Sequence, residues 1–297
     1  MAKINWFPGH MAKSLKELKK EAASCNYFIE CCDARLPLTS RNQEFAKLAQ
    51  EQKGLILLTK ADLADPRATE AWLNYFETVS HRKALAVNLL EPNQVKRIRG
   101  QIISDNQDII QKARSKGRLV KPIRVMINGI PNTGKSSLIN SLCGKKSAQV
   151  ANKPGVTRSV TWLRAGHDLE LLDTPGILWP RLDTVDQQLK LAISGAIKDD
   201  LLPKLELACG LIMILSQLYP GKLAETYNLS SSEPVTTWFE SFQLLEEIAL
   251  ADNLIKKGGE ADSDRAATRL INVYRQARLG SYSLEKSDYN LSLPDSL

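Results

Sequence analysis

The sequence has no long hydrophobic run, few cysteines and only three histidines. No stretch reaches the roughly 18 consecutive apolar residues of a membrane-spanning helix, so we expect no membrane partner. The N-terminal residues lack the apolar core of a secretory signal and the composition of a transit peptide, which predicts a cytoplasmic protein. The five cysteines form no C-x-x-C pair and have no histidine at metal-ligand spacing. We therefore expect free, buried thiols rather than disulfides or a metal site.

Acidic residues are scarce in the first part of the chain. Residues 1–180 hold 28 Lys and Arg against 16 Asp and Glu, a net charge of +12, whereas residues 181–297 carry −5. An excess of positive charge favours contact with a polyanion such as RNA, and a merely soluble basic surface is the alternative. We expect no contact with DNA.

The most informative stretch is 123–138, where a short apolar run precedes a glycine-rich loop. Ile123, Val125 and Ile127 alternate as in a buried strand, and residues 129–136 match G-x-x-x-x-G-K-S before a helix. Glycines allow the backbone to approach an anion closely, and the start of the helix adds a positive dipole. The sequence therefore predicts a nucleotide-binding protein, and an ordinary glycine turn is the alternative.

Each polar residue of this loop has an expected role. Lys135 reaches the β- and γ-phosphates, and the Ser136 hydroxyl is a ligand of Mg²⁺. The residues that we assign to nucleotide binding here are Asn132, Thr133, Gly134, Lys135, Ser136 and Ser137.

Two segments after this loop could contact the γ-phosphate and its Mg²⁺. Asp173 to Gly176 read D-T-P-G at the end of an apolar strand, where the carboxylate can hold Mg²⁺ through water and the Gly176 N–H can meet the γ-phosphate. Thr157 lies between the two motifs and is our candidate for a second hydroxyl ligand of Mg²⁺, with Thr161 as the alternative. Because D-x-x-G often occurs by chance, the strand before it carries the argument.

A base-recognition motif stands before the phosphate loop instead of after it. Thr59, Lys60 and Asp62 belong to T-K-A-D, which follows an apolar strand at 54–58. The Asp62 carboxylate can accept hydrogen bonds from the N1–H and the amine of guanine, a donor pair that adenine lacks, so an ATPase or kinase is disfavoured. Asn88, after the next strand, could add backbone contacts to the base. This motif order predicts a circularly permuted GTPase, which chain topology tolerates when the termini lie close.

The periodicity of the chain predicts an α/β domain followed by an all-α domain. Strands alternate with helices up to residue 180, which favours a mostly parallel sheet with helices on both faces. We therefore expect a GTPase domain at 1–180 and a helical domain at 181–297. The expected strands are 27–32, 55–58, 84–87, 123–127, 160–165 and 169–172. The expected helices are 11–24, 42–50, 67–79, a long polar one at 94–116, and then 186–196, 203–218, 235–249 and 264–279.

The chain resembles the circularly permuted GTPases of the YlqF/YawG type. The likeness covers the NWFPGHM start, D-A-R-L-P at 33–37, the permuted motifs and the C-terminal GGEADSDRAATRLINVYRQARLG. It implies a permuted Ras-like domain and a helical RNA-binding domain that bind GTP or GDP, Mg²⁺ and the rRNA of the large ribosomal subunit precursor. It also implies a role late in assembly of that subunit, with hydrolysis stimulated by the ribosome.

The resemblance also assigns roles to residues that depart from ordinary GTPases. Thr59 stands where the family has Asn, so Asp62 should retain guanine selectivity while the contact to N7 is in question. Ile177 stands where Ras-like enzymes carry a water-orienting glutamine. The family shares this hydrophobic substitution, which implies slow turnover of the free protein. A nucleotide-gated RNA-binding module with incidental hydrolysis is therefore the alternative function.

Two further residues have candidate roles in hydrolysis. His10 matches the histidine of the family's P-G-H-M signature, which is implicated there in hydrolysis, although a lone histidine is more often structural or solvated. Asn132 matches the asparagine that helps to hold K⁺ near the phosphates in potassium-activated relatives, and a plain turn asparagine is the alternative. We thus expect His10, Lys135 and Thr157 to act in catalysis.

Overall fold

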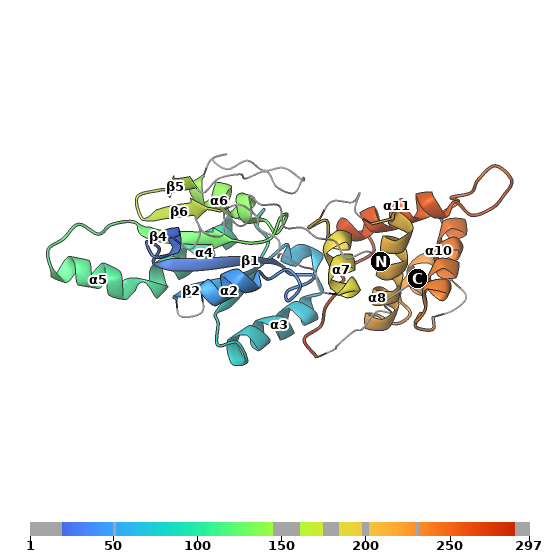
Figure 1. Cartoon of the computed structure of the whole chain (residues 1–297), viewed down its shortest axis with the longest axis horizontal. Coiled ribbons are helices and arrows are strands. Elements are labelled where there is room, and N and C mark those ends of the chain that lie inside the picture. The colour runs from blue at the N-terminus through green and yellow to red at the C-terminus, as the bar shows by residue number, and fades with distance from the viewer. Residues whose placement is uncertain are drawn as a thin grey trace. The chain divides into compact units, whose positions relative to one another are not determined.

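The computed structural model describes residues 20–49, 52–144, 161–174, 184–197, 202–229 and 232–288. These residues form a six-stranded sheet with helices around it and a separate group of helices (Figure 1). The chain divides into two compact units, which we call the sheet unit and the helical unit. Within the described residues, no helix is long and apolar enough to span a membrane.

The sheet unit confirms the predicted α/β fold. The strands lie in the order β3-β2-β1-β4-β6-β5, and all neighbours are parallel except β5 and β6, which form an antiparallel pair. Each strand lies within a residue or two of its expected position. The strands are β1 (Tyr27–Asp33), β2 (Gly54–Thr59), β3 (Ala84–Val87), β4 (Ile123–Asn128), β5 (Thr161–Ala165) and β6 (Leu169–Asp173).

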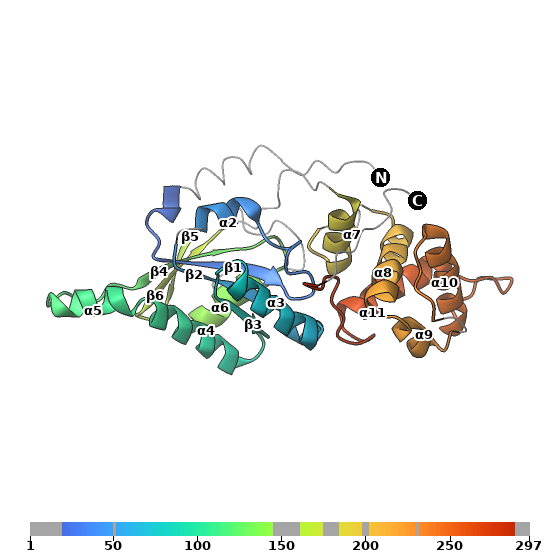
Figure 2. The ribbon, with the colours of Figure 1, turned by 90° about the horizontal axis from the view of Figure 1, so that it is seen from below.

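Helices cover both faces of the sheet. Successive side chains of a strand point to opposite faces, so a strand that is apolar throughout needs helices on both sides to bury it. Figure 2 shows α2 (Gln43–Ala49) on one side, with α4 (Pro92–Asp105) and α6 (Lys135–Cys143) on the other. In β1, Tyr27 belongs to the core that includes residues of α4 and α6, whereas the next residue, Phe28, packs with α2. Buried apolar side chains therefore hold the sheet from both sides.

The single long helix expected at 94–116 is wrong, because the segment forms two helices. α4 ends at Asp105, and α5 (Gln107–Ser115) begins after Asn106. Asn106 is buried, and its Nδ2 donates to the Ile102 carbonyl at 2.8 Å. An asparagine side chain that bonds the preceding turn competes with the helical hydrogen-bond ladder. The break leaves Asn106 between two separate helices of the sheet unit.

The helical unit is built around α8, whose long apolar sequence is buried almost throughout. Helices α7, α10 and α11 pack against it. The expected helices are found with shifted ends, and the short α9 was not expected. The helices are α7 (Val185–Ser194), α8 (Lys204–Leu218), α9 (Lys222–Tyr227), α10 (Trp238–Ala251) and α11 (Ser263–Arg275).

A segment from much earlier in the chain also belongs to the helical unit. Leu63–Trp72, which includes the start of α3 (Pro66–Thr78), clusters with it. The Tyr219 hydroxyl donates to the Asp65 carboxylate at 3.1 Å, and the Asp65 N–H donates to the Ser283 hydroxyl at 3.2 Å. The chain therefore enters the helical unit directly after Asp62, the expected guanine-binding residue.

Candidate nucleotide-binding site

The predicted motifs meet at one edge of the sheet. The strands β1, β2, β3, β4 and β6 are parallel, so their carboxyl ends lie along the same edge, where ligands of open α/β sheets bind. The register pairs Thr59 with Asp33 on one side and with Val87 on the other, and it pairs Ile127 with Asp173. Segments that are far apart in the sequence are thus neighbours here.

The phosphate loop between β4 and α6 is tightly wrapped. A Cβ atom at Gly129 would lie 2.5 Å from the Thr133 hydroxyl oxygen and 2.7 Å from the Cys31 carbonyl oxygen, so only glycine fits. Asn132 and Gly134 have positive φ angles of 59° and 81°. This backbone conformation turns the loop around a central space, as an anion site requires.

The start of α6 presents backbone donors to this loop. Its N-cap is Gly134, which has no side chain to cap the first N–H groups of the helix. Uncapped N–H groups and the helix dipole together bind anions. Ser136 and Ser137 are half-buried in the first turn, and Leu138 and Ile139 anchor the next turn in the core. The arrangement suits phosphate groups.

Lys135 and Asp173 form a buried ion pair, and each side chain is only 7% exposed. Asp173 ends β6, and Lys135 begins α6, so the pair joins the two segments assigned to phosphate and metal. Neither charge reaches bulk water, so each depends on the other for compensation. A bound phosphate group would give Lys135 a new anionic partner and release the carboxylate.

The oxygen ligands of this edge fit Mg²⁺ in the presence of a nucleotide. Mg²⁺ is usually held by one or two carboxylates together with phosphate oxygens and water, rather than by a cage of side chains. The described residues contain no group of three or more His, Cys, Asp or Glu that could hold a metal. The Asp173 carboxylate and the Ser136 hydroxyl supply hard oxygen ligands beside the phosphate loop.

Thr59 has a role that the sequence did not predict. Its buried hydroxyl lies 2.8 Å from the Thr133 carbonyl oxygen and 3.0 Å from the Cys32 carbonyl oxygen. The single hydroxyl proton can be donated to either one, so Thr59 links the base-recognition strand to the phosphate loop and to β1. The hydroxyl is therefore engaged by the protein itself.

Asp33, at the end of β1, anchors the loop that follows β2. Its buried carboxylate accepts hydrogen bonds from the Arg35 guanidinium at 2.8 and 2.9 Å and from the Lys60 ammonium at 2.9 Å. Burial alone would raise the pKa of Asp33, but these two cations outweigh it and hold the pKa well below its usual value. Lys60 has a positive φ of 55°. The D-A-R-L-P segment thus positions T-K-A-D.

Asp62 and Asn88 lie at neighbouring strand ends but in different local settings. Asp62 lies in a short 3-10 turn (Ala61–Leu63) and is exposed. The Asn88 N–H donates to the Gln94 side chain at 2.7 Å, and its carbonyl accepts from the Glu91 N–H at 3.1 Å. Backbone contacts from Asn88 to a base would therefore require this turn to open.

Several predicted residues lie outside the described residues, namely His10, Thr157, Gly176 and Ile177. The two described histidines are both exposed and lie on the other edge of the sheet. His81 precedes β3, and His167 precedes β6. Neither is positioned at the carboxyl edge, where the nucleotide motifs meet.

The cysteines are mostly buried, as the sequence predicts, although Cys143 is partly exposed. All five are free, and four of them are buried. Burial raises the pKa of Cys31, which lies next to the phosphate loop, to about 12. The thiol is therefore neutral at physiological pH and acts as a small apolar core residue.

Comparisons with known proteins agree with the fold and the family resemblance. The profile of a family described as 50S ribosome-binding GTPase matches residues 124–214. Ribosome biogenesis GTPase A of Bacillus pumilus is 36% identical, covering 96% of this chain and 99% of the relative. Mitochondrial ribosome-associated GTPase 1 of Mus musculus is 31% identical, covering 95% and 90%. The solved structure of GDP-bound YlqF, 25% identical, covers 92% of this chain and 100% of that one with a TM-score of 0.63.

Fold and motif order define the protein as a circularly permuted P-loop GTPase. The resemblance noted from the sequence is thereby confirmed. The chain belongs to the ribosome biogenesis GTPase A family.

Proposed function

We propose that this protein hydrolyses GTP to GDP and phosphate as an assembly factor in late maturation of the large ribosomal subunit. Membership of a family of ribosome biogenesis GTPases supports the general role. The observation that carries the proposal is the shared edge of the sheet, where the phosphate loop, the Lys135–Asp173 pair and T-K-A-D meet. GTP, GDP and the subunit precursor with its rRNA are the partners, and the cytoplasm is the expected location.

Nucleotide binding would proceed by exchange of ion-pair partners. Lys135 would leave Asp173 for the β- and γ-phosphates, which frees the Asp173 carboxylate. Ser136, Thr157 and, through water, Asp173 would hold Mg²⁺, which when bound would offset the negative charge of the phosphates. Because Lys135 and Asp173 are already paired and buried, the free enzyme avoids two uncompensated charges at the same place.

The remaining residues are assigned to contacts with the guanine base and with the phosphates. Asp62 reads guanine, with Thr59, Lys60 and Asn88 holding the surrounding turns. The backbone groups of Asn132, Thr133, Gly134 and Ser137 hold phosphate, and Gly176 meets the γ-phosphate. Asn132 is also the candidate for holding K⁺, which would neutralise charge that develops during hydrolysis.

Hydrolysis is proposed to be slow in the free protein and stimulated by the large subunit. Ile177 replaces a water-orienting glutamine, so another group must orient the water. The resemblance to the family's P-G-H-M signature assigns this step to His10, and His81 and His167 lie on the far edge of the sheet. We place residues 1–180 in a GTPase domain and 181–297 in an RNA-binding domain.

Turnover measured with and without large subunits tests the proposal. We expect GTP hydrolysis in K⁺ buffer to rise when large-subunit precursors are added, and a GTP analogue to increase co-sedimentation relative to GDP. His10→Ala should retain GTP affinity but lose the stimulated rate, so that it stays bound to the subunit. Equal stimulated turnover for wild type and His10→Ala would remove His10 from the mechanism.

The alternative is a nucleotide-gated RNA-binding module whose hydrolysis is incidental. Ile177 supports this alternative because it cannot orient the attacking water as a glutamine would. Such a protein would show the same nucleotide-dependent co-sedimentation without any rise in turnover. The two measurements made on one sample therefore separate the two functions.

A further inference from the structure

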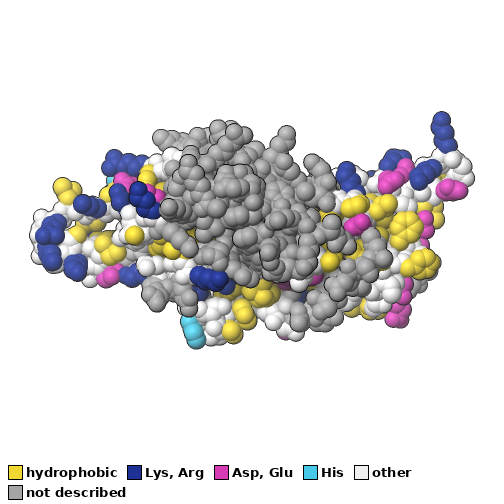
Figure 3. Space-filling model, viewed as in Figure 1, with side chains coloured by type: hydrophobic (Ala, Val, Ile, Leu, Met, Phe, Trp, Pro, Cys, Tyr) yellow, Lys and Arg dark blue, Asp and Glu magenta, His cyan; other side chains and the backbone are white. Residues whose placement is uncertain are grey.

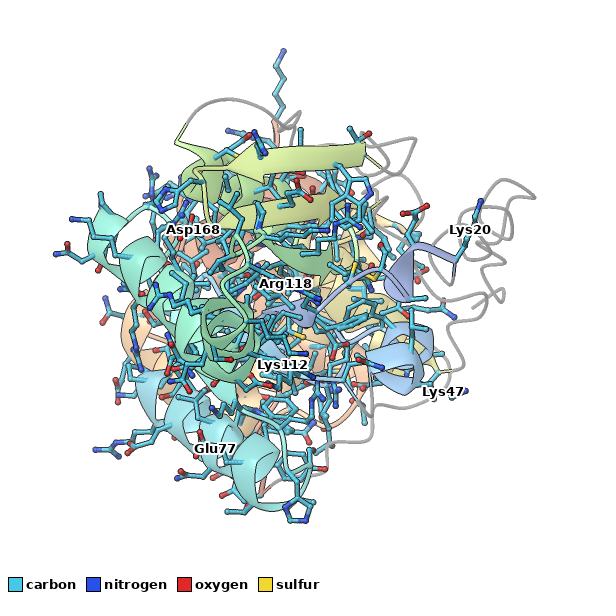
Figure 4. The ribbon with its side chains drawn as sticks, turned by 90° about the vertical axis from the view of Figure 1, so that its left-hand side faces the viewer. Lys20, Lys47, Glu77, Lys112, Arg118 and Asp168 are labelled. Atoms are coloured by element: carbon cyan, nitrogen blue, oxygen red, sulfur yellow. The ribbon has the colours of Figure 1, made fainter. Side chains whose placement is uncertain are left out.

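The end of α5 and the connection to β4 carry the densest positive charge of the sheet unit's described part. Residues 112–121 read K-A-R-S-K-G-R-L-V-K, with five basic residues and no acidic one. We call this segment the basic arm. In Figure 3, Lys and Arg side chains gather over α5, and Figure 4 shows Lys112 and Arg118 on the side that faces the viewer. The five basic residues, all exposed, are Lys112, Arg114, Lys116, Arg118 and Lys121.

The charges of the arm are not compensated by the rest of the described chain. None of the five side chains forms an ion pair with a described residue. The nearest acidic residues along α4 and α5 are engaged elsewhere, since Asp105 pairs with Lys83 and Asp108 pairs with Lys53. Some other basic side chains of the same unit are paired, for example Arg99 with Asp168, whereas Lys96 and Arg97 on α4 form no ion pair with a described residue. Within the described residues, the arm is therefore distinguished by its density of unpaired positive charge.

Hydrogen bonds define the backbone of the first part of the arm, at the end of α5. Gly117 has a positive φ of 63°, its N–H donates to the Arg114 carbonyl at 2.9 Å, and the Arg118 N–H donates to the Ala113 carbonyl at 2.9 Å. This pair of bonds is the Schellman motif that closes a helix. Ile110 anchors the helix in the core of the sheet unit. The backbone of residues 113–118 thus needs little ordering when a partner binds.

Helix stability accounts for only part of this charge. Lys112 and Arg114 lie in the last turn of α5, where cations offset the negative end of the helix dipole. Lys116, Arg118 and Lys121 lie beyond the helix, so this local role does not explain them. Their exposure without acidic partners suits an anionic ligand from outside the chain.

We propose that the basic arm binds the phosphate backbone of rRNA in the large ribosomal subunit, an inference that rests on the proposed function. The arm exposes two apolar side chains, Leu119 and Val120, but five of its ten residues are cationic, whereas a protein partner normally requires a larger apolar centre. Exposed arginines and lysines along a rigid segment instead match the phosphates of a folded RNA. The arm precedes β4, so it lies at the edge of the sheet opposite the nucleotide site. RNA can therefore bind there without covering GTP.

A charge-reversed pair and a matched control test this surface. The arm variant is Lys116→Glu with Arg118→Glu, and the control is Lys96→Glu with Arg97→Glu on α4, where both residues are exposed and form no ion pair with described residues. The net charge changes equally in the two variants. The probes are purified large subunits and a mixed-sequence RNA duplex, titrated over a series of KCl concentrations. GTP affinity and circular dichroism check that both variants are folded.

We expect the arm variant to bind both probes about tenfold or more weakly at physiological salt. The slope of log affinity against log salt should fall by about 2, since each lost phosphate contact removes roughly 0.9 from it. The control should stay within about twofold of wild type. Equal losses in both variants would show a net-charge effect and overturn the proposal. Weaker subunit binding with unchanged duplex binding would indicate a ribosomal protein instead of RNA and would also overturn it.

Failure of the proposed function is distinguishable from failure of the arm. If wild type binds large subunits, and the arm variant does so with the same affinity and salt slope, the arm proposal is wrong and the proposed function stands. If wild type does not bind large subunits but its duplex binding depends on the arm, the RNA contact stands and the proposed function is wrong.

Discussion

The carboxyl edge of the sheet and the outer face of α11 use the same kind of ion pair in opposite surroundings. At the sheet edge, Asp33 and its partner Arg35 are 4% and 2% exposed. On α11, Arg269 pairs with Asp252 at 2.7 Å, but the arginine side chain is 54% exposed. A buried pair leaves an uncompensated charge when one partner is removed, whereas water and salt replace the partner in an exposed pair. Burial should therefore decide which pairs the protein cannot lose.

The largest effect is expected from breaking the buried pairs of Asp33. Asp33→Asn leaves the guanidinium of Arg35 and the ammonium of Lys60 without their carboxylate, and we expect the free energy of unfolding to fall by about 3–5 kcal/mol. Urea unfolding measures it. The control is Glu170→Gln in the same sheet unit, whose partner Arg124 is half-exposed, with an expected loss of at most about 1 kcal/mol. Similar losses for the two variants would contradict the comparison.

The stability difference between wild type and Asp33→Asn should decrease at low pH. The pKa of Asp33 lies well below its ordinary value of 3.8 when the protein is folded, because Arg35 and Lys60 outweigh the effect of burial. The stability from its charge is complete above the ordinary value and is lost as the pH falls toward the folded value. The advantage of wild type over Asp33→Asn should therefore be constant near neutral pH and shrink below about pH 4. A gap that stays constant into strong acid would refute the assignment.

A smaller effect is expected at the base, where Asp62 is exposed instead of buried. Asp62→Asn replaces an acceptor oxygen with a donor facing the guanine N1–H and amine, which should cost about 2–4 kcal/mol of GTP affinity. Xanthosine triphosphate, which has an acceptor where guanine has its amine, should bind the variant more tightly than it binds wild type. Calorimetry with both nucleotides measures the exchange, and undiminished GTP binding by Asp62→Asn would show that the guanine-binding residue lies elsewhere.

Substitution of Thr59 should change GTP affinity less than Asp62→Asn does. Thr59→Val removes the proton shared between the Thr133 and Cys32 carbonyls and should lower GTP affinity by about 1–2 kcal/mol, while Thr59→Ser should keep it. Since this hydroxyl is engaged by the protein, 7-deaza-GTP should bind wild type nearly as well as GTP does. A strong preference for GTP over the 7-deaza analogue would show that Thr59 turns to the base.

The sequence predicted the sheet and its motifs well because each strand is a short apolar run that ends in a recognisable motif. It could not predict the hydrogen bond from Asn106 to Ile102, which divides the long helix, because asparagine also occurs inside helices. The link from Thr59 to Thr133 joins residues that only the sheet brings together. Local pattern therefore located the elements, while contacts between distant residues decided how the site is held.

The anchoring of Leu63–Trp72 on the helical unit was missed for the same reason. Its hydrogen bonds reach Tyr219 and Ser283, more than a hundred residues further along the chain. No local signal around Asp65 distinguishes such an anchor from an ordinary helix start. The segment after Asp62, the proposed guanine-binding residue, therefore belongs to the helical unit rather than to the sheet.

The smallest effect is expected on α11, where the cations are exposed and already share acidic neighbours. Arg265 lies 3.9 Å from Asp262, and Arg269 pairs with Asp252. Charge reversal of both arginines should change the free energy of unfolding by less than about 1 kcal/mol, because water screens these pairs. If α11 contacts rRNA, the same variant should lower the salt slope of subunit binding by about 1, less than the loss expected for the basic arm, since the acidic neighbours compete with phosphate. Unchanged affinity and slope would remove α11 from the RNA-binding surface and leave the sheet unit as the source of the electrostatic attraction.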